Sequence, residues 1–254
     1  MNLSILIMTC DKNSDISNFV IETLLKFKEC SVNGYISTER NALPYNGLNC
    51  MCSLNSFSKR MVECIENIEE DYVLILLDDY YVYDDNLPIK IDEWMKEICE
   101  NNLSALKICY DGKIYKKTKK GLSGTKIYKK INVYDIDFHP TIWKKDILLD
   151  ILRERDLSPW QIEPLFSKHL SAGNYICGIS KEKIKYEELI VGGMFFRKAF
   201  NKYCRSKYNG DRKILKLSQD LFFRIRRFVR HITPRFVIKI IKKITGKKGY
   251  SDYY

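Results

Sequence analysis

Along the first 110 residues, apolar and polar positions follow two alternating patterns. Short apolar runs with the character of buried strands occur at residues 3–9, 32–37, 72–77 and 105–109. Between these runs, apolar residues recur every three or four positions, the period of an amphipathic helix, at residues 16–27, 57–68 and 87–101. Strands that take turns with helices predict an α/β fold with a mixed, mainly parallel sheet flanked by helices.

The pattern is looser after residue 110. A Gly- and Lys-rich stretch at 111–130 predicts a loop or an irregular hairpin. Helical periodicity returns at 144–153. A further helix is expected to begin at Pro164, because proline favours the first helical position, and to end at Gly173. Short strands are predicted at 175–178 and 184–186.

The charge of the chain is concentrated in its last part. Residues 1–196 contain 25 Lys and Arg against 29 Asp and Glu, whereas residues 197–254 contain 18 against 3. In the basic part, apolar residues step by three or four from Ile214 to Ile232 and again beyond Pro234, with cations between them. This pattern predicts two basic amphipathic helices separated by the proline. We therefore expect a main domain at 1–196 and a basic helical segment at 197–254.

The basic segment allows three interpretations: the solvated face of a helical subdomain, a nucleic-acid-binding surface, or a segment that lies on a membrane. No recognisable nucleic-acid-binding module surrounds the cations, so we expect no nucleic acid partner. An apolar face beside a cationic one fits an anionic membrane surface best. With no run of 18 apolar residues, no signal-peptide pattern and an odd number of nine cysteines, we expect a cytoplasmic protein, peripheral on the inner face of the cell membrane.

The carboxylates that follow the apolar run at 72–77 are the first candidates for chemistry. Ligands of open α/β sheets bind outside the carboxyl ends of the strands, where Asp78 and Asp79 are expected. Adjacent carboxylates repel each other unless a cation or hydrogen-bond donors compensate. Mn²⁺ or Mg²⁺ bridging a carboxylate to a pyrophosphate is one such compensation. The alternative is that one Asp caps the next turn and the other is solvated.

Several segments in order resemble a known family. Residues 56–60 (SFSKR) and 71–79 (DYVLILLDD) are similar to the nucleotide-sugar half of the large inverting, family-2-like GT-A glycosyltransferases of bacterial capsule and O-antigen synthesis. The opening at 5–11 (ILIMTCD) resembles that family's first strand and nucleotide-contacting turn. The family's acceptor half is matched by residues 142–148 (IWKKDIL), 160–163 (WQIE) and 172–175 (AGNY). The resemblance covers roughly residues 1–195, with Tyr80 in the place of the second acidic residue of a D-x-D motif.

The resemblance implies a glycosyltransferase of the hexosyltransferase type, with a UDP-sugar as donor and a lipid-linked saccharide or polysaccharide as acceptor. Inversion at the anomeric carbon and a divalent metal, Mn²⁺ or Mg²⁺, held by Asp79 and Asp78 are implied as well. The donor-binding residues that it implies are Thr9, Asp11, Glu39, Arg60, Asp78 and Asp79. Those implied on the acceptor side are Glu163 as catalytic base, with Trp160 and His139 as substrate contacts.

Each candidate also has a plainer interpretation. Glu163, expected just before a helix at Pro164, would be kept ionised by the helix N-terminus and could merely stabilise that helix. Trp160 could stack on a sugar or pack in the core. Arg60 could meet a diphosphate or be solvated. His139 could approach the acceptor or diphosphate, or simply make local hydrogen bonds in a loop.

Two other functions are considered. A sugar nucleotidyltransferase would need a Gly- and Lys/Arg-rich phosphate loop after the first strand, and residues 9–13 (TCDKN) do not supply one. A membrane- or nucleic-acid-binding protein without enzymatic activity would have no use for the acidic cluster at the strand end.

Overall fold

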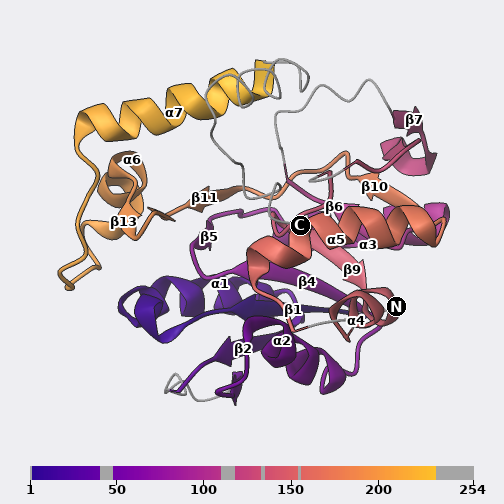
Figure 1. The fold of residues 1–254 in the computed structure, drawn as a ribbon, viewed down its shortest axis with the longest axis horizontal. Coiled ribbons are helices and arrows are strands. Elements are labelled where there is room, and N and C mark those ends of the chain that lie inside the picture. Colours follow the sequence, from indigo (N-terminus) through magenta and orange to yellow (C-terminus); the bar gives the residue numbers. More distant parts are fainter. Residues whose placement is uncertain (1, 41–47, 110–117, 133–134, 154–155, 233–254) are drawn as a thin grey trace. The chain divides into compact units, whose positions relative to one another are not determined.

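The computed structural model describes residues 2–40, 48–109, 118–132, 135–153 and 156–232, with side chains up to Ile225 (Figure 1). The chain divides into two compact units, Met1–Tyr110 with Lys117–Glu188, and Asp111–Lys116 with Leu189–Tyr254. We call them unit 1 and unit 2. The second of the two predicted basic helices, beyond Pro234, lies outside the described residues.

The framework of unit 1 is a mixed sheet, nine-stranded within the described residues, with the order β3-β2-β1-β4-β9-β6-β10-β8-β7. Strands β3, β2, β1 and β4 are parallel, β9 is antiparallel to both β4 and β6, and β10 returns parallel to β6. The strands are β1 (Leu3–Met8), β2 (Asn33–Thr38), β3 (Asn49–Cys52), β4 (Tyr72–Leu77), β6 (Ala105–Lys107), β7 (Thr118–Lys120), β8 (Lys126–Tyr128), β9 (Thr141–Lys144) and β10 (Cys177–Ile179). A separate antiparallel pair joins β5 (Tyr80–Val82) to β11 (Tyr186–Glu188).

Helices cover both faces of this sheet and give unit 1 two hydrophobic cores. Side chains alternate across a strand, so Ile5 and Ile7 of β1 enter one core and Leu6 and Met8 the other. The first core lies under α1 (Ser17–Glu29) and α3 (Leu87–Asn101). The second lies under α2 (Phe57–Glu66), α4 (Lys145–Arg153) and α5 (Pro159–Ala172). Two short 3-10 turns, η1 (Asp11–Ile16) and η2 (Leu122–Gly124), complete the unit.

Helix α5 begins five residues before the predicted position, at Pro159 instead of Pro164. Ser158 and Gln161 form a capping box, in which the Gln161 Oε1 accepts the backbone N–H of Ser158 at 2.9 Å. Pro159 takes the first helical position, so Pro164 falls inside the helix, where it has no N–H for the carbonyl of Trp160. The prediction was wrong because the later proline was taken for the start signal.

Unit 2 begins with a tight hairpin of β12 (Ile190–Val191) and β13 (Met194–Phe195). Gly192 and Gly193 form its turn with φ angles of 56° and 79°, the left-handed pair that a two-residue type I′ turn requires. The helices are α6 (Arg197–Ala199), the π-helical turn η3 (Phe200–Cys204) and α7 (Leu217–Ile232). Phe195 is fully buried, with the rings of Phe200 and Tyr208 at 5.2 and 4.8 Å.

All nine cysteines lie among the described residues, and none forms a disulfide bond. Cys64, Cys109, Cys177 and Cys204 are buried, whereas Cys52 and Cys99 are exposed. Cys52 ends β3, and its thiol donates to the carbonyl oxygen of Glu39 at 3.1 Å. Within the described part of the chain, no helix combines the length and apolar character that crossing a membrane requires.

The capping box of α5 provides a first test of this structure. Removing the Ser158 hydroxyl by Ser158→Ala should lower the free energy of unfolding by about 1 kcal/mol, the usual cost of losing an N-cap. Urea denaturation measures this change. Ser206→Ala removes an exposed hydroxyl outside α5 and should leave stability within about 0.5 kcal/mol of the parent. Equal effects of the two substitutions would contradict the assigned helix start.

Candidate active site

The parallel strands deliver the predicted donor-side residues to one edge of the sheet. Met8 of β1 pairs with Ser37 of β2 and with Leu77 of β4. The residues that follow these strands, among them Thr9, Glu39 and Asp78, therefore emerge together at the carboxyl edge, where open α/β sheets bind ligands.

Asp78 is the centre of the donor-side cluster. It is 9 % exposed, and its Oδ2 accepts the Thr9 hydroxyl at 2.8 Å. The Asn13 side-chain amide donates to both carboxylate oxygens, at 3.0 and 2.9 Å. Asp78 thereby ties the turn after β1 to the end of β4. Sequence reasoning missed Asn13, whose only signal was its position within a few residues of the first strand end.

Asp11, Glu39 and Arg60 form the other part of this cluster. The backbone N–H of Asp11 donates to Glu39 Oε2 at 3.0 Å, and the Asp11 carboxylate accepts the N–H of Arg40 at 3.1 Å. Arg60 is 3 % exposed and donates from Nη1 to the carbonyl oxygen of Thr9 at 3.0 Å, with Nη2 3.8 Å from Glu39 Oε1. Arg60 is thus not a solvated arginine. Its buried guanidinium holds the ends of β1 and β2 together and has little surface left for a diphosphate.

Glu163 lies on the second turn of α5 and bonds to the segment that leads into β9. Its Oε1 accepts the backbone N–H of Phe138 at 3.2 Å. Burial, together with the negative charge of Asp137, raises the pKa of Glu163, while the Phe138 N–H works against the rise. This direction is opposite to the one expected for a carboxylate at a helix N-terminus. The reason is the earlier start of α5, since helix-terminus effects fade after the first turn.

Beside Glu163 lies a buried ion pair that the sequence did not indicate. The Lys107 ammonium, fully buried at the end of β6, is 2.9 Å from Asp137 Oδ1. His139 Nδ1 is 3.1 Å from the same oxygen. Although burial works to raise it, the hydrogen bond from His139 and the charge of Lys107 hold the pKa of Asp137 well below its ordinary value. A buried lysine looks the same in sequence as one on the surface, so only the fold could reveal this pair.

Aromatic rings connect the donor and acceptor halves. The His139 ring, whose side chain is 42 % exposed, stacks on Tyr80 with centroids 6.1 Å apart. Tyr80 directly follows Asp79, which is half-buried in the turn between β4 and β5. Burial and the negative charge of Asp79 raise the pKa of Tyr80 well above its ordinary value, so its phenol stays neutral. The predicted acceptor contact His139 and the predicted metal ligand Asp79 are therefore brought to one place.

Trp160 is exposed rather than part of the core. It lies in the first turn of α5 and is 62 % exposed. Residues three apart on a helix share a face, so its indole neighbours Glu163. The position leaves a flat apolar ring accessible beside the carboxylate.

A metal held by the protein alone does not fit the donor set. Among the described residues, no three His, Cys, Asp or Glu side chains lie close enough to hold an ion together. Both oxygens of Asp78 already accept protein hydrogen bonds. Asp79 adds a second carboxylate at this edge, and Mg²⁺ is commonly bound by one or two carboxylates together with substrate phosphates. The residues fit a metal that a bound diphosphate would share.

Comparisons with known proteins give matches at the level of structure. No family model and no curated protein matches the chain. The structure of S. aureus TarS aligns with a TM-score of 0.50 and 15 % identity over 92 % of this chain and 44 % of TarS. TarS 1–349 in complex with UDP-GlcNAc aligns with a TM-score of 0.46 and 13 % identity, over 73 % of this chain and 58 % of that one. UDP-glucose pyrophosphorylase complexed with UDP-glucose gives a TM-score of 0.48 and 12 % identity, over 74 % of this chain and 93 % of that one.

The chain has the fold of nucleotide-diphospho-sugar transferases. The α/β, mainly parallel GT-A fold class predicted from the sequence is therefore confirmed. The chain spans less than half of the length of the TarS chain with which it aligns.

The buried ion pair gives a second test. Lys107→Met leaves Asp137 buried without its cation and should lower the free energy of unfolding at neutral pH by about 3 kcal/mol. Because the pKa of Asp137 is lowered in the folded protein, its ionised carboxylate stabilises the fold above the ordinary Asp pKa of about 3.9. This stabilisation is lost as the pH falls below that value. The deficit of the variant should therefore shrink in acid. Urea denaturation at several pH values measures it.

Two variants control this experiment. Lys144→Met removes an exposed lysine from the neighbouring strand β9 and should change stability by no more than about 0.5 kcal/mol. Adding Asp137→Asn to Lys107→Met leaves no charge buried and should recover part of the loss. A Lys107→Met protein as stable as Lys144→Met would show that the pair does not hold this side of the site together.

Proposed function

We propose that this protein is a glycosyltransferase that moves a sugar from a UDP-linked donor to a hydroxyl of a lipid-linked saccharide or polysaccharide in bacterial surface-polysaccharide assembly. The observation that carries the proposal is Glu163. It is a carboxylate with a raised pKa, held by the Phe138 N–H at the sheet edge where the donor-side cluster also lies. A base with this environment beside a nucleotide-sugar fold suits the activation of an acceptor hydroxyl.

On the donor side, Thr9, Asp11 and Glu39 would contact the nucleotide. Asp78 and Arg60 would act through them, because their own polar atoms bind Thr9 and lie near Glu39. Asp79 would hold a divalent metal together with the donor diphosphate, with Asp78 as its closest acidic neighbour in sequence. The metal, when bound, would neutralise charge on the diphosphate leaving group.

On the acceptor side, Glu163 would take the proton of the attacking hydroxyl as the oxygen bonds to the anomeric carbon. The bond from that carbon to the diphosphate oxygen breaks, and UDP leaves with the electron pair. Attack opposite to the leaving group inverts the anomeric centre. The exposed ring of Trp160 would stack on a sugar. Nδ1 of His139 lies 3.1 Å from Asp137 Oδ1, and we assign the other ring nitrogen, Nε2, to the substrate.

The sugar nucleotidyltransferase remains the alternative enzyme on this fold. The segment after β1 is the 3-10 turn Asp11–Ile16, which is not the Gly- and Lys/Arg-rich phosphate loop that such an enzyme would need. The two activities release different products. Incubation with UDP-sugar and acceptor should yield UDP, whereas incubation of a nucleoside triphosphate with a sugar phosphate should yield no pyrophosphate.

We further propose that residues 1–196 carry the transferase and that residues 197–254 hold it at an anionic membrane surface, on the cytoplasmic side where nucleotide sugars are used. The support for this is charge. The segment contains 18 Lys and Arg against 3 Asp and Glu. About 1 kcal/mol per well-placed cation is available at an anionic bilayer.

Glu163→Gln tests the base. The amide still accepts the Phe138 N–H but cannot take a proton, so turnover should fall by about 10²-fold or more while UDP affinity stays within a few-fold. In the parent, the raised pKa should place the acid limb of the rate above pH 4.5, because the ionised carboxylate is required. Steady-state rates across pH measure both effects.

The stability of the same variant separates catalysis from folding. A raised carboxylate pKa favours the fold at low pH, and this contribution is lost as the pH rises through it. Glu163→Gln should therefore be no less stable than the parent at pH 7. Glu69→Gln, at an exposed glutamate, should keep parental turnover. Near-parental turnover of Glu163→Gln would reduce Glu163 to a structural acceptor.

Asp79→Asn tests the metal. Calorimetric titration should show weaker UDP binding in Mn²⁺ than the parent, by about tenfold, and little change in EDTA, because one carboxylate ligand is lost. Asp85→Asn, at a side chain that is 92 % exposed, should bind UDP like the parent. If the parent binds UDP equally well with and without metal, the proposed metal-binding role of Asp79 is wrong, and protein groups must neutralise the diphosphate instead.

A further inference from the structure

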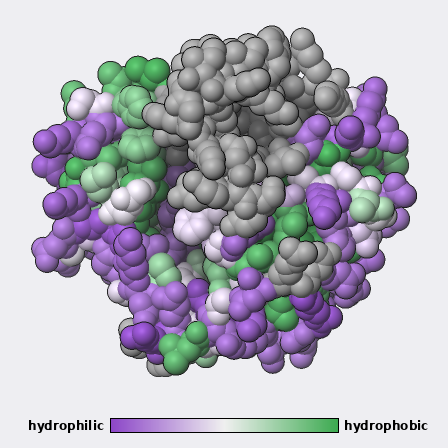
Figure 2. Space-filling model, in the orientation of Figure 1, coloured by the Kyte–Doolittle hydropathy of each residue, from purple (hydrophilic) through white to green (hydrophobic). Residues whose placement is uncertain are grey.

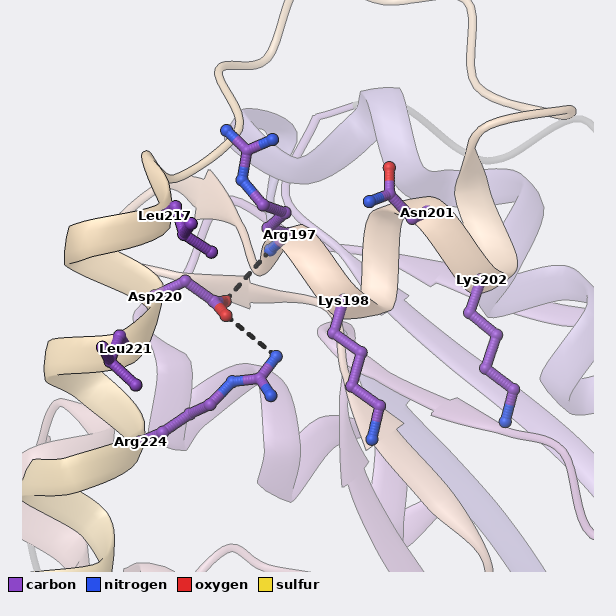
Figure 3. A pocket seen from close by; sticks show the side chains of 8 residues that line it. All are labelled: Arg197, Lys198, Asn201, Lys202, Leu217, Asp220, Leu221 and Arg224. Atoms are coloured by element: carbon purple, nitrogen blue, oxygen red, sulfur yellow. Dashed lines mark hydrogen bonds and ion pairs between the residues drawn. The ribbon is translucent and has the colours of Figure 1, made fainter.

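A groove of about 590 Å³ runs along α7 in unit 2 (Figure 3). Its lining is both basic and apolar. Arg197, Lys198, Lys202 and Arg224 supply the cations, and Leu217 and Leu221 project into it from α7. Every residue that lines the groove belongs to unit 2.

Among the described residues that line the groove, the one acidic side chain is neutralised within the protein. Asp220 is 4 % exposed, accepts the backbone N–H of Arg197 at 3.2 Å and pairs with the Arg224 guanidinium at 2.8 Å. It thereby holds Arg224 at the groove. Lys198 and Lys202 are exposed, one helical turn apart, and extend in the same direction (Figure 3). Because Arg224 and Asp220 pair with each other, Arg197, Lys198 and Lys202 give the groove its net positive charge, which is complementary to an anion.

The start of α7 also exposes aliphatic surface. Leu217, Leu221 and Ile225 follow one another at every fourth position and are 70, 54 and 52 % exposed. Phe222 beside them is 60 % exposed. Hydrophobic surface adjoins hydrophilic surface at the upper left of Figure 2, where α6 and α7 lie in Figure 1. An apolar row of this kind marks a surface that meets a non-aqueous partner.

We propose that this groove is a binding site for the phosphate of an anionic phospholipid in a bilayer. Lys198, Lys202 and Arg224 would contact the phosphate, while Leu217, Leu221 and Ile225 enter the interfacial region beside it. A bilayer is favoured because it presents phosphates and an apolar phase in one surface. Nucleic acid or a soluble phosphate would satisfy the cations and leave the aliphatic row in water.

This inference rests on the proposed membrane contact of residues 197–254, and it gives that contact a location and a ligand. It does not depend on sugar transfer. The cations stand on α6, η3 and α7, and the leucines stand on α7, so binding would require unit 2 to be folded. In this respect the site differs from a basic tail that binds anywhere along its length.

Vesicle sedimentation of the full chain tests the site. The protein should bind phosphatidylcholine vesicles that contain phosphatidylglycerol and bind pure phosphatidylcholine weakly, and added salt should reduce the binding. Lys198→Ala with Lys202→Ala should lower the partition coefficient by about tenfold or more, given the usual contribution of each cation. Lys119→Ala with Lys120→Ala makes the same change in net charge at the exposed strand β7 and should stay within about twofold of the parent.

A second pair of variants tests the apolar row. Leu217→Ser with Leu221→Ser should lower the binding that persists at high salt, because that part does not depend on charge. Leu54→Ser with Leu122→Ser replaces two leucines that are 78 and 60 % exposed elsewhere and should leave it unchanged. All four variants should keep parental UDP affinity.

The proposal is overturned if the Lys198 and Lys202 variant binds vesicles as well as the Lys119 and Lys120 variant does. It is also overturned if glycerol phosphate competes fully with vesicles, or if the protein forms a dimer that hides the groove. Tight RNA binding without vesicle binding would overturn it as well. Failure of the transferase hypothesis would give a different result. The parent protein would bind no UDP, while the vesicle results would be unchanged.

Discussion

The predicted acceptor side of the candidate site depends on one buried cation. Lys107 has no exposed surface, and a buried ammonium requires an anionic partner. Asp137 provides it and is thereby kept ionised. Its carboxylate lies 3.1 Å from Nδ1 of His139, and its negative charge adds to burial in raising the pKa of Glu163. One ion pair at the end of β6 thus bears on both of these candidate residues.

On the predicted donor side the central buried charge is an anion instead of a cation. There the buried anion is Asp78, and it is compensated by the neutral donors Thr9 and Asn13 instead of a cation. The buried cation of that half, Arg60, binds a backbone carbonyl and approaches Glu39. Asp78 and Arg60 are therefore engaged mainly by protein groups, which is why we assign them to shaping the proposed site and not to touching a substrate.

Local sequence signals predicted the elements whose pattern is strong, such as β4 over 72–77 and α3 over 87–101. They missed β9, which lies antiparallel between β4 and β6, because such pairing is decided by distant strands. The meeting of Thr9, Glu39 and Asp78 at one edge of the sheet followed from the strand ends, whereas the contacts of Lys107 and Asn13 became visible only in the structure. Arg60 was expected either to meet a diphosphate or to be solvated, and its direction into the protein, toward the carbonyl oxygen of Thr9, could not be read from its neighbours in sequence.

The cysteines differ in exposure, which bears on where a fluorescent dye can be attached. Cys52 is exposed and donates to the carbonyl oxygen of Glu39, whereas Cys64 and Cys177 are closed off in the core. An alkylating dye would therefore react at Cys52 and at the exposed Cys99 before it reaches the buried thiols, while Cys10, Cys30 and Cys50 are half-buried. In a variant with serine at these four other accessible positions, a fluorophore on Cys52 would stand beside Glu39, which accepts the backbone N–H of Asp11. A change in its emission on addition of UDP would report on this part of the sheet edge without any added tag.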